Sequence, residues 1–99
     1  MAKKQAVGIE GITAKASPIL RRHNVIRAAL FGSIVRGEMK KTSDVDVLVE
    51  IRGQKSLLDV VALRQELEDA VGRKVDLVQY SAIHPMLRER ILKEQKVII

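Results

Sequence analysis

The sequence contains no cysteine and only two aromatic residues, Phe31 and Tyr80. Without cysteine, disulfide bonds, zinc–thiolate sites and thiol nucleophiles are excluded. The scarcity of aromatic residues predicts an aliphatic core, and it argues against binding of single-stranded nucleic acid by base stacking, which needs exposed rings. No apolar run has the length of a signal sequence or a membrane span, so we expect a cytoplasmic protein without a membrane partner.

The length and composition favour one small folded unit. The 99 residues suffice for a single domain over residues 1–99, and an apolar fraction of 46% indicates a globular fold rather than disorder. Gly8 and Gly11 disfavour a helix near the N-terminus, so we expect residues 1–16 to be poorly ordered. The net charge of +6 favours a polyanionic partner, although the same excess also serves solubility.

The apolar pattern predicts alternating helices and strands. Ser17 and Pro18 are typical of a helix start, with serine as the N-cap and proline at the first helical position. Three more helices are expected, over residues 33–36, from Ser56 to a stop at Gly72, and from His84 or Pro85 to Glu94. Strands are expected over residues 25–31, 44–51 and 75–78, and the tail 97–99 forms either an edge strand or a partner contact. This order predicts an α/β fold or α+β sandwich, a small mixed β-sheet with helices packed on it.

Asp44 and Asp46 are the first candidate functional residues. Two positions apart on a strand, they point to the same face with Cα atoms roughly 6.5 Å apart. Strands disfavour aspartate and two carboxylates repel each other, so a pair kept there indicates a bound cation. Carboxylate oxygens suit Mg²⁺ or Mn²⁺. The alternative is a solvated strand edge, where the charges oppose aggregation.

Two further features carry chemistry only in combination with this pair. Gly32 and Ser33 lie at a strand-to-helix junction, where free N–H groups attract phosphate, and Arg36 follows one turn later. An ordinary turn with a serine cap is the alternative. Asp76 is a charged residue inside a short apolar strand. If that strand lies beside the first pair, three carboxylates converge; otherwise Asp76 faces solvent or pairs with Arg73 or Lys74.

Together these residues resemble the signature of the DNA polymerase β-like nucleotidyltransferases, and most closely the minimal nucleotidyltransferases. The signature consists of Gly32-Ser33, a short helix ending in Arg36-Gly37, and the Asp44-Val45-Asp46 strand. Asp76 stands where the family places its third carboxylate. The resemblance extends from about Ser17 to Glu94, and it implies a fold like the polymerase β palm.

The resemblance implies a catalytic mechanism. Asp44, Asp46 and Asp76 would bind Mg²⁺, two ions in the usual arrangement, with Mn²⁺ as a substitute. Gly32, Ser33 and Arg36 would bind the phosphates of ATP or another nucleoside triphosphate. Asp76 would also help to activate a hydroxyl that attacks the α-phosphorus, so that pyrophosphate leaves and a nucleoside monophosphate is transferred.

The resemblance also implies a partner. Minimal nucleotidyltransferases pair with HEPN-domain RNase toxins and act as antitoxins that transfer AMP to the toxin. One alternative is a module that neutralises its partner by contact alone. Another is a nucleic-acid-binding domain, for which the candidate basic residues are Arg21, Arg22, Arg27, Lys40, Lys41, Arg88 and Arg90, although their helices read more simply as solvated faces.

The remaining polar and aromatic candidates have simpler interpretations. His23 and His84 lack partners at ligand spacing and are expected at the surface. Tyr80 is expected to cover an edge of the core rather than to stack on a base. Glu50 lies on the Asp46 side of its strand, but roughly 13 Å farther along, too far to share a metal.

Overall fold

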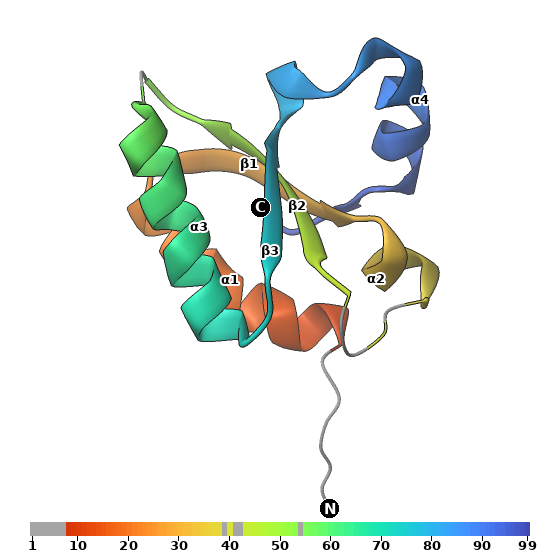
Figure 1. Ribbon diagram of the computed structural model, residues 1–99, viewed down its shortest axis with the longest axis horizontal. Helices are drawn as coiled ribbons and strands as arrows, with labels where there is room; N and C mark the ends of the chain where they lie inside the picture. Colours follow the sequence, from red (N-terminus) through yellow and green to blue (C-terminus); the bar gives the residue numbers. More distant parts are fainter. Residues whose placement is uncertain (1–7, 39, 41–42, 54) are drawn as a thin grey trace, which may run out of the picture.

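The computed structural model describes residues 8–38, 40, 43–53 and 55–99 (Figure 1). Helices and strands alternate along the chain, as predicted. The elements are α1 (Ile9–Arg22), β1 (Val25–Phe31), α2 (Ser33–Arg36), β2 (Val45–Ile51), α3 (Leu57–Val71), β3 (Val75–Gln79), the 3-10 turn η1 (Tyr80–Ala82), α4 (Pro85–Glu94) and β4 (Lys96–Val97). None of the described helices combines the length and apolar character of a membrane-spanning segment.

The four strands form one mixed sheet in the order β3-β2-β1-β4. β1 is antiparallel to both of its neighbours, whereas β2 and β3 run parallel. β4 lies at the edge, and the N–H groups of Ile98 and Ile99 donate to the carbonyl of Ala28 at 2.9 and 3.2 Å. The edge strand therefore covers Lys96 and Val97, and the rest of the tail 97–99 is hydrogen-bonded to β1, in agreement with the first of the two predicted possibilities.

One face of the sheet is covered by α1 and α3, and this side holds the main core (Figure 1). Its buried side chains are aliphatic, as the lack of aromatic residues predicts: Ile12, Ala16, Leu20, Val25, Ala28, Leu30, Ile34, Val45, Val47, Val49, Leu63, Leu67, Val71 and Val75. A smaller cluster on the other face contains Ala29, Leu48, Tyr80 and Ile83. Because alternate residues of a strand face opposite sides, Asp46 shares the second face with Leu48.

The first helix begins at Ile9 and not at Ser17, so that prediction is wrong. Residues 9–16 form its first half, and Pro18 lies inside the helix. The reason is the apolar stripe of Ile12, Ala16 and Leu20, which is buried against the sheet. Burial of this stripe offsets the helix-propensity cost of Gly11, about 1 kcal/mol, and the hydrogen bond that proline cannot donate.

The two later helices begin and end where the sequence indicates. Ser56 and Asp59 form a capping box at the start of α3, with hydrogen bonds of 3.2 and 3.0 Å in the two directions. Gly72 ends α3 in the left-handed conformation. His84 is the N-cap of α4, and its Nδ1 accepts a hydrogen bond from the N–H of Met86 at 3.1 Å.

Candidate functional site

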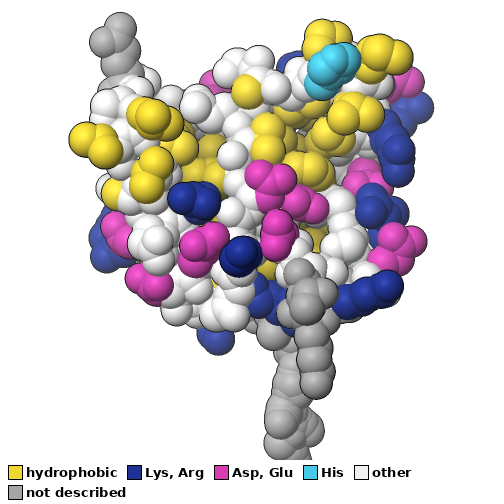
Figure 2. Space-filling model, in the orientation of Figure 1, with side chains coloured by type: hydrophobic (Ala, Val, Ile, Leu, Met, Phe, Trp, Pro, Cys, Tyr) yellow, Lys and Arg dark blue, Asp and Glu magenta, His cyan; other side chains and the backbone are white. Residues whose placement is uncertain are grey.

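At the start of the parallel strand pair, Asp46 interacts with both of the other predicted carboxylates. Asp46 of β2 is the register partner of Asp76 of β3, and Asp44 immediately precedes β2. Burial raises the pKa of Asp46 to about 6, with further contributions from the charges of Asp76 and Asp44 and from a hydrogen bond to Asp76. Figure 2 shows acidic side chains gathered over this part of the face. Asp44 and Asp76 are exposed, so a ligand can reach the cluster from solvent.

Gly32 brings the backbone directly against this cluster. It follows Phe31, the register partner of Asp46, and has a φ of +80°. A Cβ atom at position 32 would collide with the Oδ2 atom of Asp46. Glycine is therefore required by both the conformation and the close approach. The predicted phosphate-binding turn and the predicted metal ligands thus lie side by side.

Arg36 lies at the end of α2 and completes the predicted set. Its charge lowers the pKa of Asp46, which opposes part of the rise caused by burial and by the neighbouring carboxylates. Hydrogen bonds to Glu38 and Glu94 raise the pKa of Arg36 above its ordinary value. The guanidinium is therefore a permanent positive charge beside the acidic cluster. Ser33 begins α2 directly after Gly32 and is half-buried.

Glu94, near the C-terminus, is a site residue that no pattern in the sequence indicated. Its Oε1 atom accepts a hydrogen bond from the N–H of Gly32 at 2.9 Å. Nη1 of Arg36 lies 3.1 and 3.0 Å from its two carboxylate oxygens. Although burial raises the pKa of Glu94, these hydrogen bonds lower it below the ordinary value. No local pattern signals the role, because Glu94 is 62 residues from Gly32 and reads as an ordinary helix-surface glutamate.

Arg73 fixes the backbone that leads into Asp44. Its Nη1 donates to the carbonyl oxygens of Lys40 at 2.8 Å and Ser43 at 3.2 Å. Ser43 Oγ in turn accepts from the N–H of Lys40 at 2.8 Å. Lys40 is exposed, as expected of a solvated loop. Lys41, a candidate basic residue, lies outside the described residues.

The acidic residues fit a divalent cation that arrives with a ligand of its own. Within the described ranges, no three acidic or histidine side chains are gathered into a ready-made metal cage. Magnesium seldom uses such cages, because it commonly takes one or two carboxylates and completes its octahedron with water and phosphate oxygens. The repulsion that raises the pKa of Asp46 is what a cation would relieve. The donor set therefore fits a magnesium–nucleotide complex.

The other candidate residues lie in different surroundings. Nε2 of His23 lies 2.8 Å from Oε2 of Glu66, on the side of the molecule where α1 approaches α3. Tyr80 is buried in the smaller core cluster, and the guanidinium of Arg27 stacks over its ring at 4.2 Å. This burial confirms the prediction that Tyr80 covers the core. Glu50 lines a separate hollow of about 400 Å³ beside Tyr80.

Three residues of the alternative basic patch make contacts within the protein. Arg22 pairs with Glu66 at 2.6 Å, Arg27 stacks over Tyr80, and Arg88 donates to the backbone carbonyl of Tyr80 at 3.0 Å. On the face shown in Figure 2, lysine and arginine side chains alternate with acidic ones. The mixture of charges on that face does not favour a continuous nucleic-acid-binding surface there.

Comparison with known proteins gives a consistent match. A family model described as "Polymerase beta, Nucleotidyltransferase" matches residues 14–99. MJ0435 of Methanocaldococcus jannaschii, named as a candidate protein adenylyltransferase, is 51% identical over 88 residues, which cover 89% of this chain and 95% of that protein. The protein adenylyltransferase MntA of Thermococcus cleftensis is 39% identical over 83 residues, which cover 84% of each.

Solved structures share the arrangement of strands and helices. The structure of a candidate minimal nucleotidyltransferase has a TM-score of 0.78 and 33% identity, covering 94% of this chain and 98% of that one. A chain of a toxin–antitoxin complex with AMP-PNP has a TM-score of 0.77 and 25% identity, covering 88% and 72%. A chain in the complex of tri-AMPylated Shewanella oneidensis HEPN toxin with MNT antitoxin has a TM-score of 0.71 at 22% identity, covering 91% and 71%, which shows a shared fold.

Proposed function

Because the chain belongs to the polymerase β-type nucleotidyltransferase family, we propose that it transfers AMP from ATP to a hydroxyl group of a HEPN-domain toxin and so acts as its antitoxin. The mixed sheet with packed helices is the fold of this family, as predicted. The observation that carries the proposal is the interaction of Asp46 with both Asp76 and Asp44, directly beside the Gly32 turn.

The carboxylates have separate roles in this proposal. The family is typically metal-dependent. Asp44 and Asp46 would hold Mg²⁺, Asp76 would complete a second site, and Mn²⁺ could substitute. The bound ions supply Lewis-acid stabilisation of the charge that develops on the phosphates. Asp76 accepts the proton of the attacking hydroxyl.

The phosphate-binding residues hold the nucleotide for an in-line displacement. The N–H of Gly32, the hydroxyl of Ser33 and the guanidinium of Arg36 bind phosphate oxygens. The acceptor oxygen then forms a bond to the α-phosphorus, the bond from that phosphorus to the bridging oxygen breaks, and pyrophosphate leaves. The products are the adenylylated acceptor and pyrophosphate.

A protein acceptor agrees with the apolar side chains that this protein exposes. Exposed apolar side chains occur at the start of α3, where Leu57 and Leu58 are 78% and 79% exposed, and on α4, where Met86 is 86% exposed. Figure 2 shows apolar side chains on both sides of the acidic area. Leu57 and Leu58 lie at the end of the sheet opposite to the start of β2 (Figure 1). Exposed apolar groups on one face of a protein are typical of a protein-binding surface. Because chains of similar fold occur in toxin–antitoxin complexes, we propose a HEPN toxin as the partner.

The first test is calorimetric titration of ATP, with and without Mg²⁺, into the wild type and the Asp44→Asn/Asp46→Asn variant. Asp69→Asn is the matched control, since Asp69 is an exposed carboxylate on α3. We expect Mg²⁺-dependent binding by the wild type and the control, and none by the double variant. Circular dichroism must first show that all three proteins are folded.

The second test is co-expression with a HEPN-domain toxin, followed by mass spectrometry of the toxin. We expect the toxin to gain AMP with the wild type and with Asp69→Asn, but not with Asp44→Asn/Asp46→Asn. If the double variant still neutralised the toxin fully, contact alone would be sufficient. If no complex and no modified toxin were found with the wild type, the HEPN assignment would be wrong.

A further inference from the structure

An acidic side chain of the protein already occupies a site built for an anion. The N–H of Gly32 and the guanidinium of Arg36, here called the anion seat, together hold the carboxylate of Glu94 through contacts of 2.9 to 3.1 Å. The side chain of Glu94 is only 17% exposed. A partly buried charge is stabilised by such partners, so these contacts hold the carboxylate in place.

The anion seat lies beside the acidic cluster. Gly32 approaches Asp46 so closely that no Cβ atom fits between them, and the charge of Arg36 acts on Asp46. An anion on the seat is therefore a neighbour of any cation held by Asp46. A carboxylate and a phosphate present similar oxygens to an N–H group and a guanidinium. The two anions cannot occupy the same donors at once.

The helix that carries Glu94 is held loosely. No residue of α4 is buried. Ile91 and Leu92 pack only partly against the smaller core cluster, and Arg88 donates to the carbonyl of Tyr80. A helix with so few buried contacts belongs to the low-stability end of a structure. Glu94 is therefore a principal connection between α4 and the site.

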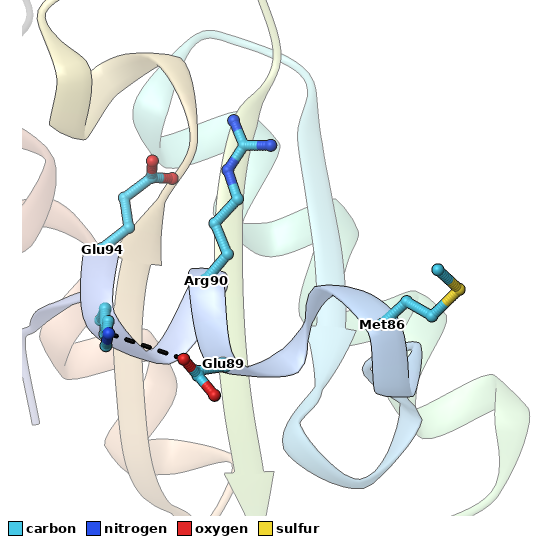
Figure 3. A pocket seen from close by; sticks show the side chains of 5 residues that line it. Met86, Glu89, Arg90 and Glu94 are labelled. Carbon is cyan, nitrogen blue, oxygen red and sulfur yellow. Dashed lines mark ion pairs between the residues drawn. The ribbon is translucent and has the colours of Figure 1, made fainter.

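The space beside Glu94 is open to a ligand. A hollow of about 760 Å³ is lined by Met86, Glu89, Arg90, Lys93 and Glu94. In Figure 3, Glu94 and Arg90 extend from the same side of α4, whereas Glu89 is paired with Lys93. The positive charge of Arg90 acts on Glu94 and lines the approach to the anion seat. A negatively charged ligand can thus reach the seat along a partly basic wall.

We propose that Glu94 is a built-in competitor of the nucleotide: in the free protein it occupies the anion seat, and a phosphate group of the nucleoside triphosphate displaces it and releases the end of α4. This inference rests on the proposed function, because it assumes that the nucleotide binds at Gly32 and Arg36. The nucleotide binds only to the fraction of molecules in which the seat is free. If Glu94 occupies the seat nine times in ten, the apparent affinity is about tenfold weaker than that of the open seat.

The first experiment measures the affinity for Mg²⁺–ATP in the wild type, Glu94→Ala, Glu94→Gln and Glu38→Ala. Alanine keeps the helix propensity and removes the competitor. Glu38→Ala is the matched control, since Glu38 pairs with the same guanidinium at 2.9 Å but no hydrogen bond from Gly32 to it is found among the described residues. We expect Glu94→Ala to bind about tenfold more tightly, Glu94→Gln to be intermediate, and Glu38→Ala to change the affinity much less.

The second experiment uses only the wild type, so it does not depend on the folding of a variant. We expect saturating Mg²⁺–ATP to increase amide hydrogen exchange in α4 while exchange in β1 and β2 slows or stays constant. Unchanged or slower exchange in α4, or equal or weaker ATP binding by Glu94→Ala beside a wild type that binds normally, would overturn the competition alone. Absence of ATP binding in every variant would instead overturn the nucleotide assignment and the competition with it.

Discussion

Asp46 and Asp76 stand opposite each other in the parallel register of β2 and β3, and their side chains interact. A hydrogen bond between two carboxyl groups requires a proton on one of them. Together with burial, this neighbour raises the pKa of Asp46 to about 6. In the absence of a cation, the carboxylates of Asp46 and Asp76 therefore repel each other whenever both are ionised.

The stability of the metal-free protein is expected to depend on pH through Asp46. The folded pKa, about 6, lies above the ordinary value of 3.8, so the folded state binds the proton more tightly than the unfolded state. The resulting stabilisation is complete below about pH 4 and is lost as the pH rises through 6. Asp46→Asn should therefore be more stable than the wild type at pH 8, by about 1–2 kcal/mol once solvent screening is allowed for, and equal at pH 4.

Urea unfolding in EDTA at several pH values checks this prediction. Asp69→Asn is the control, and its difference from the wild type should not change with pH. Adding Mg²⁺ at pH 8 should stabilise the wild type and leave Asp46→Asn nearly unchanged, because the ion neutralises the ionised pair. A stability difference between Asp46→Asn and the wild type that stayed constant from pH 4 to 8 would contradict the assigned repulsion.

Gly32→Ala is expected to damage both folding and the site. At φ +80° and ψ −149° the position suits only glycine, and the added methyl group would collide with Asp46. We expect a loss of about 1–3 kcal/mol in the free energy of unfolding, and no Mg²⁺–ATP binding even where the variant is folded. Gly37→Ala is the matched control: it also has a positive φ, at +73°, but nothing lies within 4 Å of its Cβ position. It should lose about 1 kcal/mol and keep its ATP affinity.

Arg73 is expected to act as a positioning residue for Asp44. It holds the carbonyl oxygens of Lys40 and Ser43, which lead into the aspartate. Arg73→Ala should raise the Mg²⁺ concentration needed for half-maximal ATP binding by severalfold, because a looser segment presents Asp44 less often in the binding position. Arg64→Ala, on the exposed side of α3, is the control.

Measuring both the Mg²⁺ requirement and the unfolding midpoint of the Arg73 variants separates a positioning role from a merely structural one. A merely structural arginine would lower the unfolding midpoint without changing the Mg²⁺ requirement at temperatures where the protein is folded. Arg73→Lys should restore the low Mg²⁺ requirement of the wild type only in part, since lysine presents a single charged centre and not a planar fork. Equal Mg²⁺ requirements for Arg73→Ala and the wild type would refute the positioning role.

Local signals in the sequence were sufficient for most elements, and long-range contacts account for what was missed. Strand β1, helix α2 and the capping box of α3 each depend on residues close together in the chain, so their patterns are readable. The start of α1 was mispredicted because Ser17 and Pro18 give a strong local signal, whereas the sheet that buries Ile12 is distant. Tertiary burial overrode local propensity there.

The candidate site likewise contains residues that a local motif indicates and one residue that only a long-range contact brings in. Asp44, Asp46, Gly32 and Arg36 belong to one short motif. The pairing of β2 with β3, which the residue pattern left open, brings Asp76 to them. Glu94 could not be found, because its role arises from the return of α4 to the Gly32 turn. Only the folded chain places that carboxylate on the N–H group expected to bind phosphate.

Tyr80→Phe provides a last prediction, which tests how α4 is attached. The Tyr80 hydroxyl donates to Oε1 of Gln95 at 2.7 Å, and Gln95 is the C-cap of α4. Phenylalanine keeps the ring under Arg27 but cannot hold Gln95, so we expect a loss of about 0.5–1.5 kcal/mol in the free energy of unfolding. Amide exchange in α4 should rise more than in the rest of the protein.

Because Gln95 follows Glu94, the freed helix end should also hold Glu94 on its donors less tightly, and the affinity for Mg²⁺–ATP should increase. Faster exchange in α4 without any gain in affinity would show that α4 is anchored by Tyr80 but that Glu94 does not limit access of the nucleotide.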